Sequence, residues 1–260
     1  MIRLALILSL ATILCVALPP SANAQKVVGM DLSKGNSLQM QLCSLKPGRT
    51  MAEYEASISD YVAWSKEVGA DAFVIRLTPM FASSPEGQPG FDWIEMIAAP
   101  FEISGAGWDA WLGTERGQAL NAAWQEIADC RVTMNQLFTM FVDDEISAQD
   151  TRVVSMDWCT RHAGVSYDQT TAAHSEIVAN RSEDSPVSAW SVVYPGLGMR
   201  NAPGEYMHLL SFANSAALHS YRDAFANNEG WRQRESYEST LASCTGENVY
   251  FAQVLNRPGA

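Results

Sequence analysis

The stretch that decides the fold runs from residue 37 to residue 55 and reads SLQMQLCSLKPGRTMAEYE. Apolar and polar side chains alternate at its start, which predicts a strand over Ser37–Leu45. Lys46-Pro47-Gly48 is a turn signal, and Thr50 with Glu53 three residues later forms a capping box. The stretch therefore predicts a strand that leads through a tight turn into a helix.

The rest of the first half extends this order into a βαββαβ unit. The sequence predicts a helix up to Gly69, strands over Ala72–Thr78 and Asp92–Ala98 with a Gly/Pro/Ser loop at 83–90 between them, a helical region over Trp108–Cys130 interrupted near Gly113-Thr114, and a strand over Gln136–Val142. Trp108, Trp111 and Trp231 lie near helix starts or breaks, where we expect them to be packing anchors.

The second half repeats the unit. Its predicted elements are a strand over Val153–Thr160, a helix over Ser166–Asn180, strands over Ala189–Pro195 and Glu205–Phe212, a helical region over Ser215–Cys244 and a strand over Asn248–Leu255. Cys43 and Cys130 are 87 residues apart, and Cys159 and Cys244 are 85 apart. These matched spacings indicate a diverged duplication, with repeats at 25–142 and 153–260 and an acidic linker at 143–152.

Residues 1–24 have the pattern of a bacterial Sec-type signal peptide. Arg3 precedes an apolar run over Leu4–Leu18, and Ala22-Asn23-Ala24 is a cleavage site. Cleavage leaves 236 residues with a net charge of −13, because Arg3 is lost from a chain of net charge −12. We therefore predict a periplasmic or secreted protein.

Composition excludes several classes of protein. No second apolar run is long enough to cross a membrane, so the mature chain is not expected to associate with one. A sequence pI near 4.7 argues against nucleic-acid binding. The mature chain keeps four cysteines, an even set typical of two disulfides in an exported protein. Since they form no Cys-x-x-Cys pair, we expect no metal site.

The passage Leu45-Lys46-Pro47-Gly48-Arg49-Thr50 resembles the dimeric α+β barrel superfamily. This superfamily includes stress-responsive A/B-barrel proteins, NIPSNAP-like proteins, antibiotic-biosynthesis monooxygenases and, as fused pairs, chlorite dismutases. The resemblance covers nearly the whole mature chain and is one of topology, since the second half has His162-Ala163-Gly164-Val165-Ser166 in place of the motif. It implies an α+β fold of two tandem ferredoxin-like repeats packed sheet to sheet as an intramolecular barrel.

Three expectations follow from this architecture. Because each sheet has its partner in the same chain, the protein should be a monomer. A pocket should lie between the sheets and open near the loops at 83–90 and 196–203. Cys43–Cys130 and Cys159–Cys244 disulfides should tie the first strand of each repeat to the end of its second helix, with pairing between the repeats as the alternative.

Two polar residues stand out within the third strands of the repeats. His208 lies in a strand of the second repeat, and Glu95 is its counterpart in the first. If both face the barrel interior, they could act as a general base and its orienting partner. The alternative is that each is a hydrogen-bonded or rim-exposed polar side chain.

Arg76 is a cation within an otherwise apolar strand. We expect Arg76 to face the barrel with Val74 and Thr78, where it would bind a carboxylate ligand or pair with Glu95. The candidates for an apolar, ligand-binding wall are Trp93, Trp190, Tyr194 and Tyr206. Plain core packing is the alternative for these aromatic side chains.

Two functions remain open. The first is an exported protein that binds a small apolar or aromatic ligand in a barrel cavity, without catalysis and without a cofactor. The second is a cofactor-free barrel enzyme of the oxygenase, isomerase or cyclase type that uses Arg76, Glu95 and His208. Convergence of these three side chains in one cavity favours the enzyme, and dispersal favours the binding protein. A haem would require His208 as its axial ligand.

Overall fold

The computed structural model describes residues 26–27, 30–31, 33–83 and 90–259. The predicted signal peptide and most of the predicted loop at 83–90 lie outside these residues. No helix among the described residues is long and apolar enough to cross a membrane.

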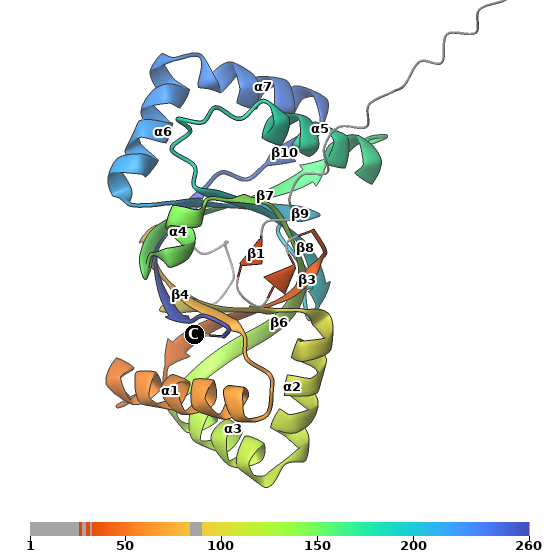
Figure 1. Ribbon diagram of the computed structural model, residues 1–260. Helices are drawn as coiled ribbons and strands as arrows, with labels where there is room; N and C mark the ends of the chain where they lie inside the picture. The colour runs from red at the N-terminus through yellow and green to blue at the C-terminus, as the bar shows by residue number, and fades with distance from the viewer. Residues whose placement is uncertain (1–25, 28–29, 32, 84–89, 260) are drawn as a thin grey trace, which may run out of the picture.

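Eight antiparallel strands close into a barrel (Figure 1). They are β3 (Asn36–Leu45), β4 (Phe73–Phe81), β5 (Trp93–Ala99), β6 (Ala128–Val142), β7 (Thr151–Arg161), β8 (Ala189–Leu197), β9 (Tyr206–Phe212) and β11 (Asn248–Asn256). The order around the barrel is β6-β3-β5-β4-β11-β7-β9-β8, and β8 pairs with β6 to close it. The short strand β10 (Ala242–Cys244) pairs with the outer edge of β7, and β1 (Lys26–Val27) and β2 (Met30–Asp31) form a separate ribbon.

Each half contributes four neighbouring barrel strands in the same order, namely its fourth, first, third and second. The second strand of each half pairs with the fourth strand of the other, so β4 joins β11 and β8 joins β6. This arrangement confirms the predicted α+β fold with two ferredoxin-like units in one barrel. The exact limits of the repeats stay a prediction.

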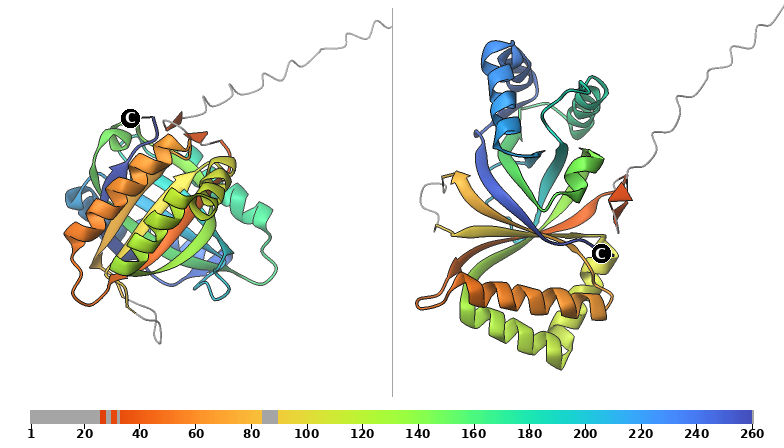
Figure 2. Two further views of the ribbon diagram at one scale, coloured as in Figure 1. Left: turned by 90° about the horizontal axis from the view of Figure 1, so that it is seen from below. Right: turned by 60° about the vertical axis from the view of Figure 1, so that its left-hand side comes forward.

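The helices cover the barrel on two opposite sides (Figures 1 and 2). The first half supplies α1 (Met51–Glu67), α2 (Phe101–Gly113) and α3 (Glu115–Ile127), and the second supplies α5 (Tyr167–Ala179), α6 (Ser215–Asn227) and α7 (Gly230–Thr240). The predicted linker contains one further helix, α4 (Asp144–Ala148). The strands beneath the helices therefore have one face toward the interior and one toward a helical layer, whereas outward residues between the two layers, such as Phe251 on β11, are exposed.

Capping explains where the first helix of each half begins. Thr50 and Glu53 form the predicted capping box at α1, and Ser166 with Gln169 forms the equivalent box at α5. These reciprocal bonds satisfy backbone N–H groups that have no partner within the helix. The strand-turn-helix prediction from residues 37–55 is confirmed.

The two disulfides join the predicted cysteines but lie on different elements. Cys43 is bonded to Cys130, and Cys159 to Cys244. The helices end at Ile127 and Thr240, so each second cysteine lies on a strand directly opposite its partner rather than at a helix end. In the chain-entropy model, closing a loop of this length stabilises the fold by about 4 kcal/mol.

The barrel interior is filled with apolar side chains. The largest buried cluster contains Leu38, Met40, Ile75, Leu77, Ile94, Met96, Leu137, Val154, Met156, Val193, Met207 and Tyr250, contributed by strands from both halves. This core fills the middle of the barrel, where the sequence predicts a ligand pocket. A cavity lined by Leu42, Phe91 and Arg131 lies at the barrel end beside the predicted loop, and a ligand pocket between the sheets stays a prediction.

Candidate functional site

The cavity of interest lies outside the barrel, between its first-half strands and the helices α1, α2 and α3. It has a volume of about 390 Å³, within the range of small-molecule sites. Aromatic and aliphatic side chains form most of the wall: Ile58, Tyr61, Trp64, Ile97, Ile103, Trp108, Trp111, Leu112, Leu120 and Trp124. The polar lining consists of Ser37, Gln39, Gln41, Ser57, Glu95, Ser104, Asn121 and Gln125.

The strand faces are inverted relative to the sequence-based expectation. Ile75 and Leu77 pack inside the barrel, whereas Val74 packs against Tyr61 of α1 in the helical layer. Arg76, predicted to face the barrel with Val74 and Thr78, therefore faces the helices. Alternation shows that neighbouring residues point to opposite sides, but the stretch from Val74 to Leu77 is buried on both faces. Polarity alone could not assign the inner face.

Glu95 and Gln41 are the buried polar groups on the strand side of this cavity. The two residues are opposite each other on β5 and β3 and share one face of the sheet. Glu95 is 0% exposed, and neither of its carboxylate oxygens has a hydrogen-bond partner. The Oε1 atom of Gln41 also lacks a partner. The nearest polar neighbours of Glu95 are Arg76 and the Tyr54 hydroxyl, which stabilise the carboxylate only in part, so these acceptor atoms can take a further donor from the cavity.

Arg76 contacts Glu95 from the neighbouring strand. Its Nε atom lies 3.8 Å from Glu95 Oε2, and its Nη1 atom donates to Glu55 Oε1 on α1 at 3.0 Å. Burial raises the pKa of Glu95 to about 7, and the positive charge of Arg76 opposes part of this rise. The carboxyl group can therefore exchange a proton near neutral pH.

The helix side of the cavity is unusually aromatic. Tyr61, Trp64 and Trp111 form a mutually contacting group, with ring centroids 5.3–5.9 Å apart. Helix α2 reads FEISGAGWDAWLG, yet none of its residues is buried. An apolar helix normally buries one face. Here that face lies over the cavity, so a bound apolar molecule would complete its packing.

The predicted catalytic residues do not converge. Arg76 and Glu95 are brought together as opposite residues on β4 and β5. His208 lies on β9 in the other half, beneath α7, on the opposite side of the barrel. The hypothesis that all three residues line one pocket is therefore wrong. Trp93 is buried beside Tyr54 at a centroid distance of 4.5 Å and is not part of the cavity wall.

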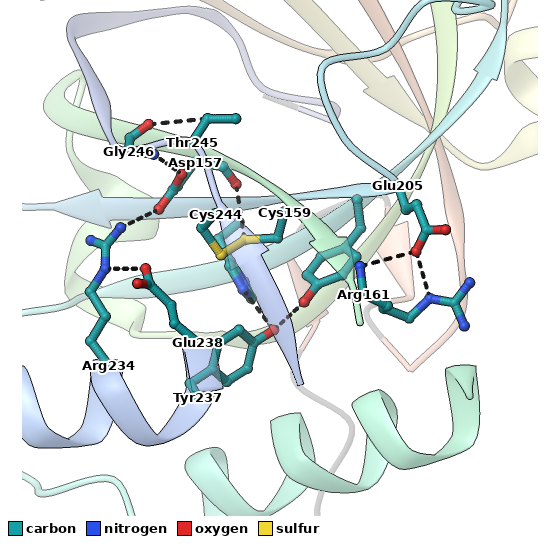
Figure 3. Close-up of a disulfide and its surroundings, with 12 residues drawn as sticks. Asp157, Cys159, Arg161, Glu205, Arg234, Tyr237, Glu238, Cys244, Thr245 and Gly246 are labelled. Atoms are coloured by element: carbon teal, nitrogen blue, oxygen red, sulfur yellow. Dashed lines mark hydrogen bonds and ion pairs between the residues drawn. A yellow bond between two sulfur atoms is a disulfide. The ribbon is translucent and has the colours of Figure 1, made fainter. Parts of the chain in front are cut away.

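In the second half, the helical layer holds a hydrogen-bonded aromatic cluster made of His174, Trp190, Tyr206, His208 and Tyr237. The hydroxyl of Tyr237 contacts the hydroxyl of Tyr206 and the Nε2 atoms of His174 and His208, the latter two at 2.9 and 3.2 Å. Figure 3 shows Tyr237 pointing from α7 toward the strands beside the Cys159–Cys244 disulfide. Predicted wall residues Trp190 and Tyr206 thus belong to this cluster, and Tyr194 packs at its edge.

The cluster fixes the protonation of its histidines. Trp190 Nε1 donates to His208 Nδ1 at 3.1 Å, so the proton of neutral His208 is on Nε2 and points to Tyr237. Burial, with smaller contributions in the same direction from His174 and Arg234, lowers the pKa of His208 to about 3. Burial alone lowers the pKa of His174 to about 4. The His174 side chain is correspondingly buried, with 2% of its surface exposed.

His208, the residue predicted as the axial ligand of a haem, is not free to bind iron. Both ring nitrogens of His208 are engaged in hydrogen bonds, so neither is available to iron. Among the described residues that line the cavity there is no histidine or methionine, and the one cysteine, Cys130, is in a disulfide.

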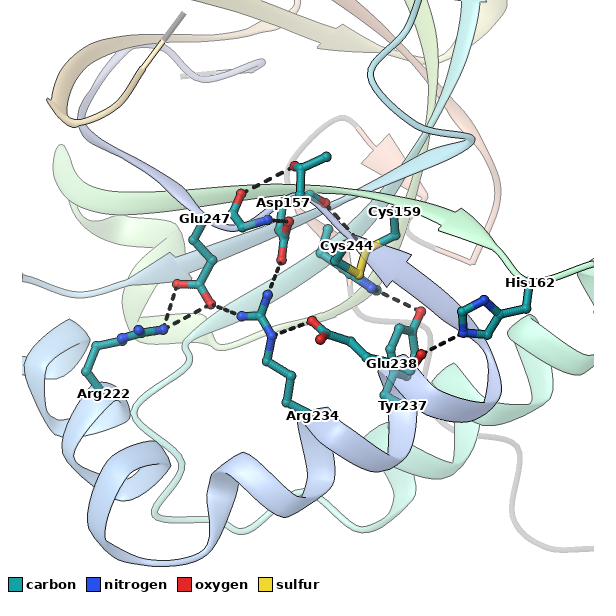
Figure 4. Close-up of polar contacts among 12 residues, drawn as sticks. Asp157, Cys159, His162, Arg222, Arg234, Tyr237, Glu238, Cys244 and Glu247 are labelled. Carbon is teal, nitrogen blue, oxygen red and sulfur yellow. Dashed lines mark hydrogen bonds and ion pairs between the residues drawn. A yellow bond between two sulfur atoms is a disulfide. The ribbon is translucent and has the colours of Figure 1, made fainter. Parts of the chain in front are cut away.

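An ion-pair network fastens α6 and α7 to the strands (Figure 4). Arg234 contacts Asp157, Glu238 and Glu247 at 3.2, 2.6 and 3.4 Å, and Arg222 also contacts Glu247. Asp157 accepts the backbone N–H of Gly246 at 2.8 Å. Asp157 also lies near Cys159 and Cys244, but their sulfur atoms are bonded to each other, so this group is not a metal site.

Sequence reasoning missed the tryptophans as cavity residues. Trp108 and Trp111 were expected to be packing anchors, and both line the cavity with Trp124. The signal in the sequence is the helical spacing of Trp108 and Trp111 on α2, followed by Trp124 on the next helix, α3. The same spacing also fits an ordinary core, so only the position of these helices distinguishes the two cases.

Comparisons with known proteins support the fold and leave the family open. No family model matches the chain, and no curated protein matches it. A solved structure named "putative monooxygenase" from Lactobacillus acidophilus aligns with a TM-score of 0.53 at 11% identity, covering 85% of this chain and 93% of its own. Another of the same description, from Fusobacterium nucleatum, aligns with a TM-score of 0.50 at 11% identity, covering 87% and 96%. At such identities the similarity shows a shared ferredoxin-like barrel fold.

Proposed function

We propose that this protein is exported and binds one small, mainly apolar or aromatic molecule in the cavity between α1, α2, α3 and the strands. The observation that carries the proposal is the fully buried carboxylate of Glu95, which has no hydrogen-bond partner and lies at a cavity lined by four tryptophans. Two disulfides are compatible with an oxidising compartment. The binding site moves from the barrel interior, where the sequence placed it, to the helical layer.

The test is binding of N-phenyl-1-naphthylamine, a neutral aromatic probe whose fluorescence rises in apolar sites. Ser104 lines the cavity from α2, so Ser104→Phe places a ring in the space the probe needs. Ser220 is exposed on α6, the equivalent helix of the second half, and Ser220→Phe is the matched control. We expect saturable binding to the parent and to the control, and at least tenfold weaker binding to Ser104→Phe. Equal binding to all three proteins would refute the proposal.

The second candidate is proton transfer on the bound molecule. It is favoured by one observation, the pKa of about 7 that burial gives Glu95 beside the cavity. Of the three residues first assigned to a catalytic mechanism, Glu95 alone lines this space. A cofactor-free reaction would therefore depend on Glu95 as a general base, with Arg76 as the group that positions it.

Ring opening of 5-nitrobenzisoxazole tests this base without knowledge of the natural substrate. The carboxylate of Glu95 takes the proton from carbon 3 while the N–O bond breaks, which yields a coloured cyanonitrophenolate. We expect Glu95→Gln to lower the rate at pH 8 at least tenfold. The exposed carboxylate Glu176 on α5 provides the control, and Glu176→Gln should react like the parent. Equal rates for all three proteins would exclude a catalytic base at this site and leave the binding proposal intact.

A further inference from the structure

The charge and shape of the cavity lining restrict what kind of molecule it accepts. Among the described residues that line it, Glu95 is the single charged side chain, and no arginine, lysine or histidine is present. An anionic ligand would meet the negative charge of Glu95 and a largely aromatic wall, with only neutral hydroxyl and amide groups to donate to it. The lining therefore disfavours anions.

The aromatic rings are arranged as walls around the space next to Glu95. Tyr61 and Trp64 come from α1, Trp108 and Trp111 from α2, and Trp124 from α3. The faces of such rings attract organic cations, and tryptophan does so most strongly. A cation in this space would be surrounded by rings from three helices.

The unpartnered atoms have the matching hydrogen-bond character. Both oxygens of Glu95 and the Oε1 atom of Gln41 accept hydrogen bonds, and all three lack a donor. Arg76 satisfies this need only in part, because its Nε atom is 3.8 Å from the carboxylate, its Nη1 atom donates to Glu55, and its Nε and Nη2 atoms themselves have no hydrogen-bond acceptor. With Glu55 and Glu95 ionised, these three residues carry a net charge of −1. A donor with a positive charge would both satisfy the acceptor atoms of Glu95 and Gln41 and balance this net charge.

Resting on the proposed binding function, we infer that the ligand is an aromatic or alkyl amine that binds as a monocation, with its ammonium group at Glu95 and Gln41 and its apolar part among the tryptophans. The nitrogen donates to the carboxylate and to the amide oxygen. The apolar part packs against the cavity side of α2, none of whose residues is fully buried although Trp111 already contacts Tyr61 and Trp64.

Four small molecules of one size separate this inference from its alternatives. Phenethylamine is the cation, propylbenzene is its uncharged isostere, 2-phenylethanol is a neutral donor, and 3-phenylpropionate is an anion. Each molecule is titrated at pH 8 into the parent protein with N-phenyl-1-naphthylamine bound, and displacement of the probe measures its affinity. We expect phenethylamine to bind at least tenfold more tightly than the other three, and this preference to fall to about one in Glu95→Gln.

The parent alone provides a second test, which does not depend on folding of a variant. Protonation of Glu95 at pH 5.5 should reduce the preference for phenethylamine over propylbenzene at least fivefold. The other titratable groups that face Glu95 are Arg76 from β4 and Tyr54 and Tyr61 from α1, and the burial-raised pKa values of both tyrosines keep them neutral. Glu55 contacts Arg76 from the solvent side, and α2 and α3 present tryptophans.

Each outcome decides between the inference and the binding proposal on which it rests. If propylbenzene or 2-phenylethanol binds as tightly as phenethylamine, the inference that the ligand is a cation is overturned and the binding proposal stands. A preference for phenethylamine that persists in Glu95→Gln and at pH 5.5 would overturn the assignment to this carboxylate. If none of the four molecules displaces the probe and Ser104→Phe binds it as the parent does, the binding site itself is wrong.

Discussion

Replacing Glu95 by glutamine should make the protein more stable at pH 8. The carboxyl group has a pKa of about 7 in the folded chain, compared with 4.5 when unperturbed. Such a difference corresponds to about 3 kcal/mol of free energy of unfolding once the group is ionised. Glutamine keeps the shape of the protonated acid and never ionises, so the variant avoids this destabilisation.

The sign and the pH range follow from linkage. The folded protein holds the Glu95 proton more tightly than the unfolded chain does, so the stability of the parent falls as the pH rises from about 4.5 to about 7. Near pH 4.5 the two proteins should have similar free energies of unfolding. At pH 8 the variant should be more stable by about 3 kcal/mol.

Urea unfolding followed by circular dichroism at pH 4.5, 6, 7 and 8 measures this difference. The buried histidines titrate equally in the parent and in Glu95→Gln, so their contribution cancels. Glu176→Gln removes an exposed carboxylate in the second half and should stay within about 0.5 kcal/mol of the parent throughout. A variant that is less stable at pH 8, or a difference that does not change with pH, would refute the reasoning.

Three further outcomes are expected. His174 has a pKa lowered to about 4 by burial, so the parent loses stability as the pH falls from about 6.5 toward 4, and His174→Gln should reduce the loss between pH 7 and pH 4.5 by about 2 kcal/mol in urea unfolding. Replacing Cys43 and Cys130 together by alanine should lower the free energy of unfolding by about 4 kcal/mol, and a loss below about 1 kcal/mol would contradict the chain-entropy argument. Sedimentation equilibrium of the mature chain should show a monomer, because the barrel closes within one chain, and an obligate dimer would contradict this.

The fold could be predicted because its signals are local. The turn at Lys46-Pro47-Gly48 and the box of Thr50 and Glu53 determine one strand-turn-helix passage, and the cysteine spacings indicate that the pattern recurs. Helix ends were less certain. The sequence has helical spacing over 108–130, but strand β6 already begins at Ala128. Pairing with β3 overrides the helical tendency of residues 128–130.

The site could be predicted only in part, because both faces of the barrel strands are buried. Arg76 and Glu95 were correctly identified as unusual, since a charge within a strand needs a partner. The face they occupy depends on which apolar set forms the barrel interior, and that is decided by the pairing of strands far apart in sequence. The cavity depends further on how far α2 and α3 lie from the strands, which no residue pattern records.

The two helical layers differ in how they accommodate a buried polar side chain of the barrel. Glu95 and His208 occupy corresponding positions on β5 and β9, and each has its polar atoms directed into a helical layer. His208 is bonded on both nitrogens, and rings from α5 and α7 fill the space around it. Glu95 has no hydrogen-bond partner and lies at a cavity of about 390 Å³.

If folding alone determined these residues, the buried polar side chain of each helical layer should have its hydrogen bonds satisfied. The second layer shows that this chain can do so, because both ring nitrogens of His208 are hydrogen-bonded. The buried carboxylate in the first layer, which Arg76 compensates only in part, is destabilising, and filling the cavity and neutralising Glu95 would both increase stability. Residues that reduce stability in this way are characteristic of sites that bind or react. The asymmetry between the layers therefore supports a ligand site beneath α2 and α3, and a structural role beneath α5 and α7.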